Sequence, residues 1–322
     1  MDVILAIDAG GSRTRCLAIN REIKTLGAGH AGASNHLLVE KGIVRTSLGE
    51  SINAALSQAK IKRADVVCVS AGLAGVDYDG AGADEMQDLF GELGFARTVI
   101  NGDMVIAHAG ALAGNAGVLA LAGTGSCVLG IDARGERVKV GGWGPVYGDE
   151  GSAYRIGQTA LRAAARYFDG RGEKTALLDA ILEAFKVRDF QETIERVYLK
   201  NLEPRDIAGL SLVAYKTAEA GDTIAQNIFF QAGEELAESV GAAIRRLNLP
   251  GAKVSYQGAV LQSCAMVRER MAECLKKDFP EIEIVAPKFE PVIGAFLLGG
   301  KAVGWTIDEK DFLALERAKV ER

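Results

Sequence analysis

Residues 3–20 read VILAIDAGGSRTRCLAIN. The apolar run at 3–8 predicts a buried strand, and residues 14–20 predict a second strand that runs back beside it after a tight glycine turn. The first strand ends on the carboxylate of Asp8, and the turn exposes backbone N–H groups, so the pair suits a phosphate tail with its metal ion. A hairpin with an Asp-initiated turn is the alternative. The candidate phosphate-binding residues of this turn are Gly10, Gly11, Ser12, Arg13 and Thr14.

A second turn of the same kind lies one domain length further along the chain. Residues 121–126 read LAGTGS, between expected strands at 118–122 and 124–131. A single short turn of this kind is a weak signal. Two of them one domain apart are stronger, because a polyphosphate bound between two domains needs hydrogen-bond donors from both. The candidate phosphate-binding residues here are Gly123, Thr124, Gly125 and Ser126.

Strand runs followed by helical runs predict an α/β fold. Further strands are expected at 23–29, 66–70, 98–101, 136–140 and 254–257. Helices are expected at 39–59, 84–93, 152–167, 174–185, 206–220, 223–247, 264–277 and 292–303, with a final helix at 309–319. We therefore predict an N-terminal domain over 1–112, and a C-terminal domain over 113–307 with a helical insertion at about 152–247. The tail 308–322 is expected to pack back on the first domain.

The composition predicts a globular chain and excludes several classes of protein. The 39 glycines among 322 residues are about 12%, against a usual level of about 7%, while only 6 prolines occur, so the pattern is not collagen-like. Of these glycines, 27 lie in residues 1–157, which carry both turns. A net charge of −5 argues against nucleic acid as a partner. Five cysteines without CxxC spacing argue against a disulfide framework or a four-cysteine zinc site, and they fit a reducing cytoplasm.

A long uncharged segment, residues 104–131, is long enough to cross a bilayer. It contains six glycines with polar residues between them, so buried strands around a Gly-rich turn explain it better than a membrane span. The apolar run at 3–8 is too short for a signal peptide. We expect no membrane partner.

Three other segments carry side chains suited to a substrate. Asp103 follows an expected strand, where a carboxylate can accept a proton from an attacking hydroxyl, or simply cap a helix. Residues 141–152 read GGWGPVYGDEGS, in which Trp143 offers an apolar plate for a sugar and Asp149 a carboxylate for two hydroxyls, unless the segment only caps a helix. Gly258 with Ala259, and Gly294, open expected helices, where a small residue lets a flat base approach the backbone; tight packing is the alternative.

Two further patterns, one for a dinucleotide site and one for a metal site, lack the context that such sites require. Residues 27–32 read GAGHAG and match GxGxxG, but no helix is expected to begin there, so a Rossmann dinucleotide site is not predicted. The three histidines are too scattered along the chain for a metal triad.

Together these motifs resemble the actin-like ATPase superfamily of sugar kinases, Hsp70 and actin, and within it the N-acetylglucosamine kinase and BadF/BadG ATPase-like group. The resemblance covers about residues 1–304, and its most specific part is residues 141–154, which end GDEGSAY at 148–154. It implies two ribonuclease H-like α/β domains with a cleft between them, the C-terminal one enlarged by helices. Ser34-Asn35-His36 resembles the sugar-binding Asn loop of this group. Cys127 and Val140 depart from the group's pattern near the expected sugar pocket, which leaves a preference for an N-acetyl group open.

The resemblance implies an ATP-dependent kinase that phosphorylates the 6-hydroxyl of an amino sugar or hexose. Asp8 would hold Mg²⁺, Asp103 would be the general base, and Asn35, Asp103, Trp143 and Asp149 would contact the sugar. Gly258, Ala259 and Gly294 would border the adenosine of ATP. Dimers are common in the group, so a homodimer is expected. The alternatives are an ATPase activator of a CoA-ester dehydratase or reductase with an iron–sulfur cluster, and a nucleotide-dependent assembly protein.

Overall fold

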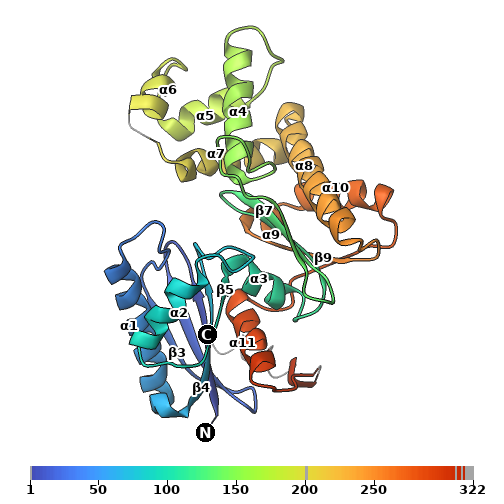
Figure 1. The fold of residues 1–322 in the computed structure, drawn as a ribbon. Helices are drawn as coiled ribbons and strands as arrows, with labels where there is room; N and C mark the ends of the chain where they lie inside the picture. The colour runs from blue at the N-terminus through green and yellow to red at the C-terminus, as the bar shows by residue number, and fades with distance from the viewer. Residues whose placement is uncertain (1, 200–201, 309, 313–314, 316–322) are drawn as a thin grey trace. The chain divides into compact units, whose positions relative to one another are not determined.

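The computed structural model describes residues 2–199, 202–308, 310–312 and 315, and the chain folds into two compact units (Figure 1). Unit 1 comprises Met1–Ala116 and Ala286–Arg322, and unit 2 comprises Gly117–Val285. This division differs from the predicted domains, which assigned residues 113–307 to one domain. The chain returns to unit 1 at residue 286, because helix α11 (Pro291–Ala302) packs there against helix α3 (Asp103–Ala111) and strand β1 (Val3–Ala9).

Unit 1 is built on a mixed sheet with the strand order β3-β2-β1-β4-β5. Strand β1 pairs antiparallel with β2 (Thr14–Asn20), which pairs antiparallel with β3 (Thr25–Ala31). On its other side β1 pairs parallel with β4 (Val66–Leu73), and β4 pairs parallel with β5 (Thr98–Gly102). The carboxyl ends of three parallel strands therefore meet at one edge of this sheet.

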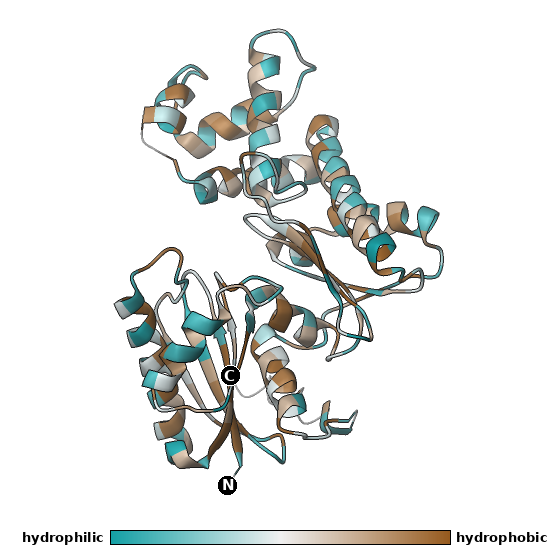
Figure 2. Ribbon diagram, viewed as in Figure 1, coloured by the Kyte–Doolittle hydropathy of each residue, from teal (hydrophilic) through white to brown (hydrophobic). Residues whose placement is uncertain are grey.

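Helices cover both faces of the unit 1 sheet, which explains why β1 is apolar throughout (Figures 1 and 2). Its odd-numbered residues pack in a core with α1 (Lys41–Ala59) and α2 (Ala83–Glu92). Its even-numbered residues Ile4 and Ala6 pack in a second core with α3 and α11. Successive side chains of a strand point to opposite faces, so Asp8 continues the even-numbered set and faces α3 and α11.

Unit 2 is built on a second mixed sheet, with the strand order β10-β9-β6-β7-β8. Strand β6 (Gly117–Ala122) pairs antiparallel with β7 (Ser126–Ile131), and β7 with β8 (Arg137–Gly141). Strand β6 also pairs parallel with β9 (Lys253–Gln257), and β9 with β10 (Glu283–Val285). The two five-stranded sheets with helices confirm the predicted α/β class.

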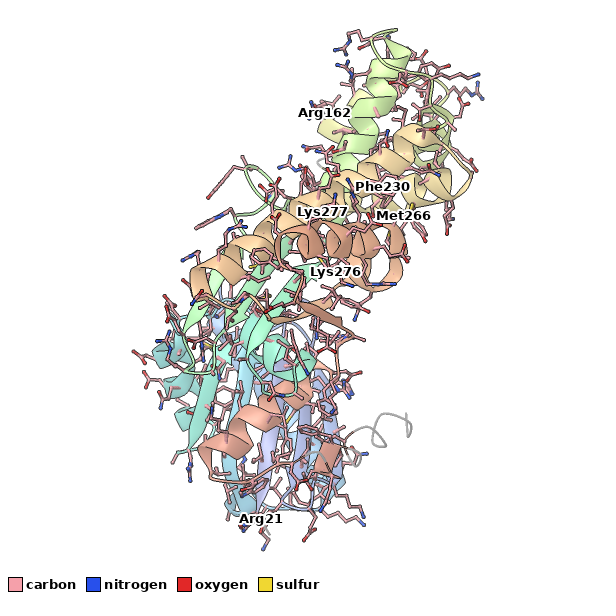
Figure 3. All side chains as sticks on the ribbon, turned by 90° about the vertical axis from the view of Figure 1, so that its right-hand side faces the viewer. Arg21, Arg162, Phe230, Met266, Lys276 and Lys277 are labelled. Carbon is pink, nitrogen blue, oxygen red and sulfur yellow. The ribbon has the colours of Figure 1, made fainter. Side chains whose placement is uncertain are left out.

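The helical enlargement of unit 2 is present, as predicted. Helix α8 (Thr223–Leu247) contacts β6, β7 and β8, and its apolar stripe lies in the core of the unit. Its exposed side and α10 (Ala265–Asp278) line a cavity of about 1050 Å³, where Figure 3 labels Phe230 and Met266. The other helical segments of the unit are α4 (Ala153–Phe168), α5 (Leu177–Phe185), α6 (Glu192–Ile194), η2 (Glu195–Leu199), α7 (Pro204–Glu219) and α9 (Ala259–Ser263). A short 3-10 turn, η1 (Arg63–Asp65), lies in unit 1.

One local prediction differs from the structure, one short strand was not predicted, and one predicted helix lies largely outside the described residues. The uncharged segment 104–131 contains strands β6 and β7, but its first part belongs to helix α3, which is buried nearly all round and so carries no polar stripe to reveal it. The short strand β10 was not predicted. The predicted final helix at 309–319 lies largely outside the described residues; of its described part, Phe312 and Leu315 pack in the α3/α11 core of unit 1. Among the described residues, no helix is long and apolar enough to cross a membrane.

Candidate active site

Asp8 lies at the carboxyl end of β1 and is half-buried. Burial raises the pKa of its carboxyl group above the usual value, and the negative charge of Asp103 raises it further. The guanidinium groups of Arg13 and Arg15 oppose these effects. Two like-charged carboxylates therefore share one neighbourhood, with cationic side chains around them.

Asp103 is the first residue of α3 and directly follows β5. The register explains its position beside Asp8, because Ala9 pairs with Leu73, and Leu73 pairs with Gly102. The N-cap of α3 is Gly102, so Asp103 is the first residue of the helix and not its N-cap. Its side chain is exposed, and Oδ1 accepts a hydrogen bond from the N–H of Met104 at 2.7 Å.

The first glycine turn is closed by a hydrogen bond from the N–H of Gly10 to the carbonyl of Arg13, at 2.9 Å. Gly11, Ser12 and Arg13 are exposed and accessible to a ligand. Thr14 is buried instead, and its hydroxyl donates to the carbonyl of Gly32 at 2.8 Å and contacts the hydroxyl of Ser34. In this structure Thr14 therefore holds the turn in place and its hydroxyl faces inward.

The loop that carries Asn35 is attached to this turn and to the end of β4. The N–H of Ser34 donates to the carbonyl of Gly10 at 3.0 Å. The Oδ1 atom of Asn35 accepts from the N–H of Leu37 at 3.0 Å. The ring of His36 lies against Gly75, where an added Cβ would be 2.6 Å from the ring atom Cε1. Asn35 therefore lies at the same edge of the unit 1 sheet as the glycine turn.

In unit 2, the second glycine turn is held by the segment that follows residue 148. The N–H of Ser126 donates to Oδ1 of Asp149 at 3.1 Å, and the hydroxyl of Ser126 donates to the carbonyl of Glu150 at 2.7 Å. Asp149 is buried, and a Cβ added to Gly125 would lie 2.7 Å from its Oδ1. Thr124 is exposed. The carboxylate of Asp149 thus packs against the turn, and its predicted contact with a sugar stays a prediction.

Gly258 lies directly against the second glycine turn. Strands β6 and β9 are parallel, so both end at the same edge of the sheet. Gly258 has φ +90°, and an added Cβ would lie only 2.3 Å from the carbonyl oxygen of Ala122. The next residue, Ala259, is exposed. The candidate adenosine segment and the candidate phosphate turn are therefore neighbours in unit 2.

Gly294 belongs to unit 1, not to unit 2 with Gly258. It is buried in α11, where an added Cβ would lie 1.9 Å from the carbonyl oxygen of Ile106 in α3. Close packing of these two helices is sufficient to explain a glycine at this position. The predicted place of Gly294 beside adenosine stays a prediction.

Trp143 lies on the exposed loop between β8 and α4. Its side chain is 63% exposed, and its ring stacks on that of Tyr147, which is 70% exposed, with a centroid distance of 6.5 Å. Gly142, beside it, lies against Cys127, whose Sγ would be 3.0 Å from an added Cβ. Since β8 runs parallel to β6, this loop leaves the sheet at the edge that carries the second glycine turn.

The sequence interpretation missed Glu290, which lies directly before α11 and forms an ion pair with Arg15. The distance between Nη1 of Arg15 and Oε2 of Glu290 is 2.5 Å. Glu290 also adds to the negative charge that raises the pKa of Asp8. The pair Glu290-Pro291 at the start of an expected helix was visible, but nothing local indicated a partner 275 residues earlier in the chain.

Comparisons with known proteins agree with the fold. The family profile of the BadF/BadG/BcrA/BcrD ATPase family matches residues 5–299. The N-acetylmuramic acid/N-acetylglucosamine kinase of Clostridium acetobutylicum is 30% identical over 303 residues, which are 92% of this chain and 98% of the relative. The N-acetyl-D-glucosamine kinase of Dictyostelium discoideum is 26% identical over 92% of this chain and 97% of its own.

A solved structure is similar over nearly the same length. It is a candidate N-acetylglucosamine kinase from Chromobacterium violaceum, with a TM-score of 0.73, 26% identity, and coverage of 92% of this chain and 98% of that chain. This likeness confirms the predicted fold class. The chain belongs to the BadF/BadG/BcrA/BcrD ATPase family.

Proposed function

We propose that this protein transfers the γ-phosphoryl group of ATP to a hydroxyl group, O6, of an amino sugar or hexose. The observation that supports this most directly is the pairing of two acids, Asp8 and Asp103, at the carboxyl edge of the unit 1 sheet. The full-length similarity to two amino-sugar kinases supports the substrate class. N-acetylglucosamine, glucosamine, glucose and N-acetylmuramic acid are the sugars to test.

The donor set at this edge fits Mg²⁺. Mg²⁺ prefers oxygen ligands and is usually held by one or two carboxylates with water and substrate phosphates, rather than by a full protein cage. Asp8 supplies such a carboxylate. Burial and the charge of Asp103 raise its pKa, and a bound cation would favour the ionised form. Among the described side chains there is no cluster of three or more acidic, histidine or cysteine groups that could hold a metal. Bound Mg²⁺ would neutralise charge on the transferring phosphoryl group.

In the proposed reaction Asp103 accepts the proton of the sugar hydroxyl as that oxygen attacks the γ-phosphorus. Its exposed position at the start of α3 leaves it accessible to a substrate. The exposed residues of the first glycine turn, and Thr124 in the second, would donate hydrogen bonds to phosphate oxygens. Asn35 and Trp143 would orient the sugar, and Gly258 would border the nucleotide. Catalysis in this class is mostly positioning and electrostatic stabilisation.

The test is ADP release in a coupled assay over the four sugars, with wild-type protein and Asp103→Asn. We expect the variant to lower kcat by about 10²–10⁴-fold, because general base catalysis contributes that much, while the Kd of the sugar changes little. Asp84→Asn, which removes an exposed acid from the first turn of α2, is the matched control. Near-normal turnover by Asp103→Asn would show that the base is another group.

The first alternative, an iron–sulfur activator of a CoA-ester enzyme, gains no support from a specific observation in the described residues. Cys16, Cys68 and Cys264 are buried, while Cys127 and Cys274 are half-buried in separate elements. An iron content measurement on anaerobically purified protein separates it from the kinase. The homodimer expected from the resemblance remains part of the proposal, and size-exclusion chromatography with light scattering tests it.

A further inference from the structure

A carboxylate on α8 holds the backbone of the loop that supports the second glycine turn. Oε2 of Glu235 accepts a hydrogen bond from the N–H of Gly151 at 2.9 Å, across 84 residues of sequence. The other oxygen, Oε1, accepts from the side-chain amide of Gln231 at 2.8 Å. Glu235 is half-buried, and both of its oxygens are engaged, so its side chain has a defined orientation.

The loop lies so close to α8 at Gly151 that only glycine fits. Gly151 has φ +72°, and an added Cβ would lie 2.5 Å from Cγ of Leu236 and 2.6 Å from the carbonyl oxygen of Ala232. Its N–H group therefore reaches the Glu235 carboxylate while its Cα packs on the helix. The helix and this side-chain acceptor therefore both contribute to the position of the loop.

From Gly151 the contacts lead directly to the glycine turn. The two preceding residues, Asp149 and Glu150, accept both hydrogen bonds that Ser126 donates. On the other side, the N–H groups of Ala153 and Tyr154 donate to the carbonyls of Gly123 and Thr124, at 2.9 and 3.1 Å. The segment fixed by Glu235 is thus hydrogen-bonded to three of the four residues of the turn.

We propose that Glu235 is a positioning residue for nucleotide binding, which acts on the second glycine turn through Gly151 and Asp149. The inference rests on the nucleotide-binding part of the proposed function, and it does not depend on which sugar is phosphorylated. Phosphate binding by backbone N–H groups requires them to converge on one point, and a shift of a fraction of an ångström in the turn weakens several hydrogen bonds together. Loss of the acceptor would release the loop and, with it, the turn.

The experiment measures the Kd of MgADP and of the non-hydrolysable analogue AMPPNP by calorimetry, with steady-state kinetics alongside. We expect Glu235→Ala to weaken nucleotide binding roughly tenfold, the fold-change that corresponds to about 1.4 kcal/mol, the scale of one charge-assisted hydrogen bond. The KM for ATP should rise by a similar factor, with a smaller change in kcat, because the turn binds phosphate before and during transfer. Sugar binding without nucleotide should not change.

Two variants distinguish positioning from general destabilisation. Glu235→Gln retains an oxygen that can accept from Gly151, so it should bind MgADP within about threefold of wild type, as a lost charge with a retained hydrogen bond predicts. Glu238→Gln, which changes an exposed acid one turn further along α8 and in the wall of the same cavity, is the control and should match wild type. Unchanged MgADP affinity in folded Glu235→Ala would overturn the proposal. Absence of activity on every sugar would contradict the proposed substrate class and leave the nucleotide measurement valid.

Discussion

At the scale of single residues, the candidate site of unit 1 contains a carboxylate, Asp8, whose ionised form is disfavoured in the folded protein. Asp8 is half-buried, the charges of Asp103 and Glu290 raise its pKa further, and the guanidinium groups of Arg13 and Arg15 oppose this effect. Strained or repulsive groups of this kind persist where function requires them. Without a bound cation, the charge on Asp8 therefore opposes folding.

Asp8→Asn should accordingly raise the Tm of the metal-free protein and abolish kinase activity. The folded-state pKa of Asp8 lies above its unfolded value, so ionisation disfavours the folded state, and the cost is present at pH values above the folded pKa. The gain in Tm should therefore be present at pH 7 and disappear as the pH falls below the pKa of Asp8 in the unfolded chain. Thermal unfolding of both proteins in EDTA from pH 3 to 8 measures this difference in Tm. Asp88→Asn, which changes an exposed acid of α2, is the control; equal Tm shifts in both variants would contradict this account.

At the scale of elements, the structure accounts for several glycines that lie outside the two glycine turns. Gly110 lies against the carbonyl of Glu290, and an added Cβ there would be 2.6 Å from that oxygen. Gly27 and Gly29, which formed the rejected GxGxxG match, pack on the backbone of α1, where an added Cβ on Gly29 would be 1.9 Å from the carbonyl oxygen of Ser51. Part of the glycine excess therefore lets helices lie close to strands and to other helices, rather than binding a ligand.

Gly258→Ala tests the junction between β9, α9 and the second glycine turn. Its φ of +90° and the 2.3 Å approach to Ala122 mean that a methyl group adds backbone strain and an overlap, which we expect to cost about 2–4 kcal/mol in the free energy of unfolding. Gly170→Ala changes a glycine with φ +72° and no neighbour within 4 Å, so it should cost about 1 kcal/mol. Urea denaturation of both variants measures the difference. Similar costs would show that strain alone decides the effect.

At the scale of the whole molecule, unit 2 is one continuous segment, while unit 1 is made of two separate segments. The core on one face of the unit 1 sheet needs both segments, because Ile4 and Ala6 of β1 pack there with Phe296 and Ala295 of α11. Removing α11 would expose this apolar face to water. The two units should therefore differ in their ability to fold alone.

We expect residues 117–285 expressed alone to unfold cooperatively, and residues 1–116 alone to lack cooperative unfolding. Addition of a peptide spanning 286–308 to the fragment 1–116 should restore cooperative unfolding, because the peptide supplies the residues of α11 that complete this core. Thermal unfolding followed by near-UV circular dichroism measures all three samples. Cooperative unfolding of 1–116 by itself would contradict this division.

Much of the fold was predictable because local patterns report it. The alternation and length of apolar runs predicted β2 over its observed bounds, Thr14–Asn20, and the apolar stripe at four-residue steps predicted α8 over Thr223–Leu247. Helix α3 was not predicted, since a helix buried on nearly all sides has no polar face. The candidate site followed the same rule: residues of the glycine turns were predicted, whereas Glu235 and Glu290, which lie far from those turns in the sequence, were not.

The sequence by itself determined the two glycine turns, the α/β class and the acids at strand ends, because each depends on residues adjacent in the chain. Only the tertiary structure decided that α11 joins the N-terminal unit, that Asp149 faces the second glycine turn, and that Glu290 and Glu235 reach the loops they hold. The physical reason is that hydrophobic burial has no directional preference, so spacing along one segment does not specify its partner. Those pairings arise when whole faces pack, and the side-chain contacts follow from them.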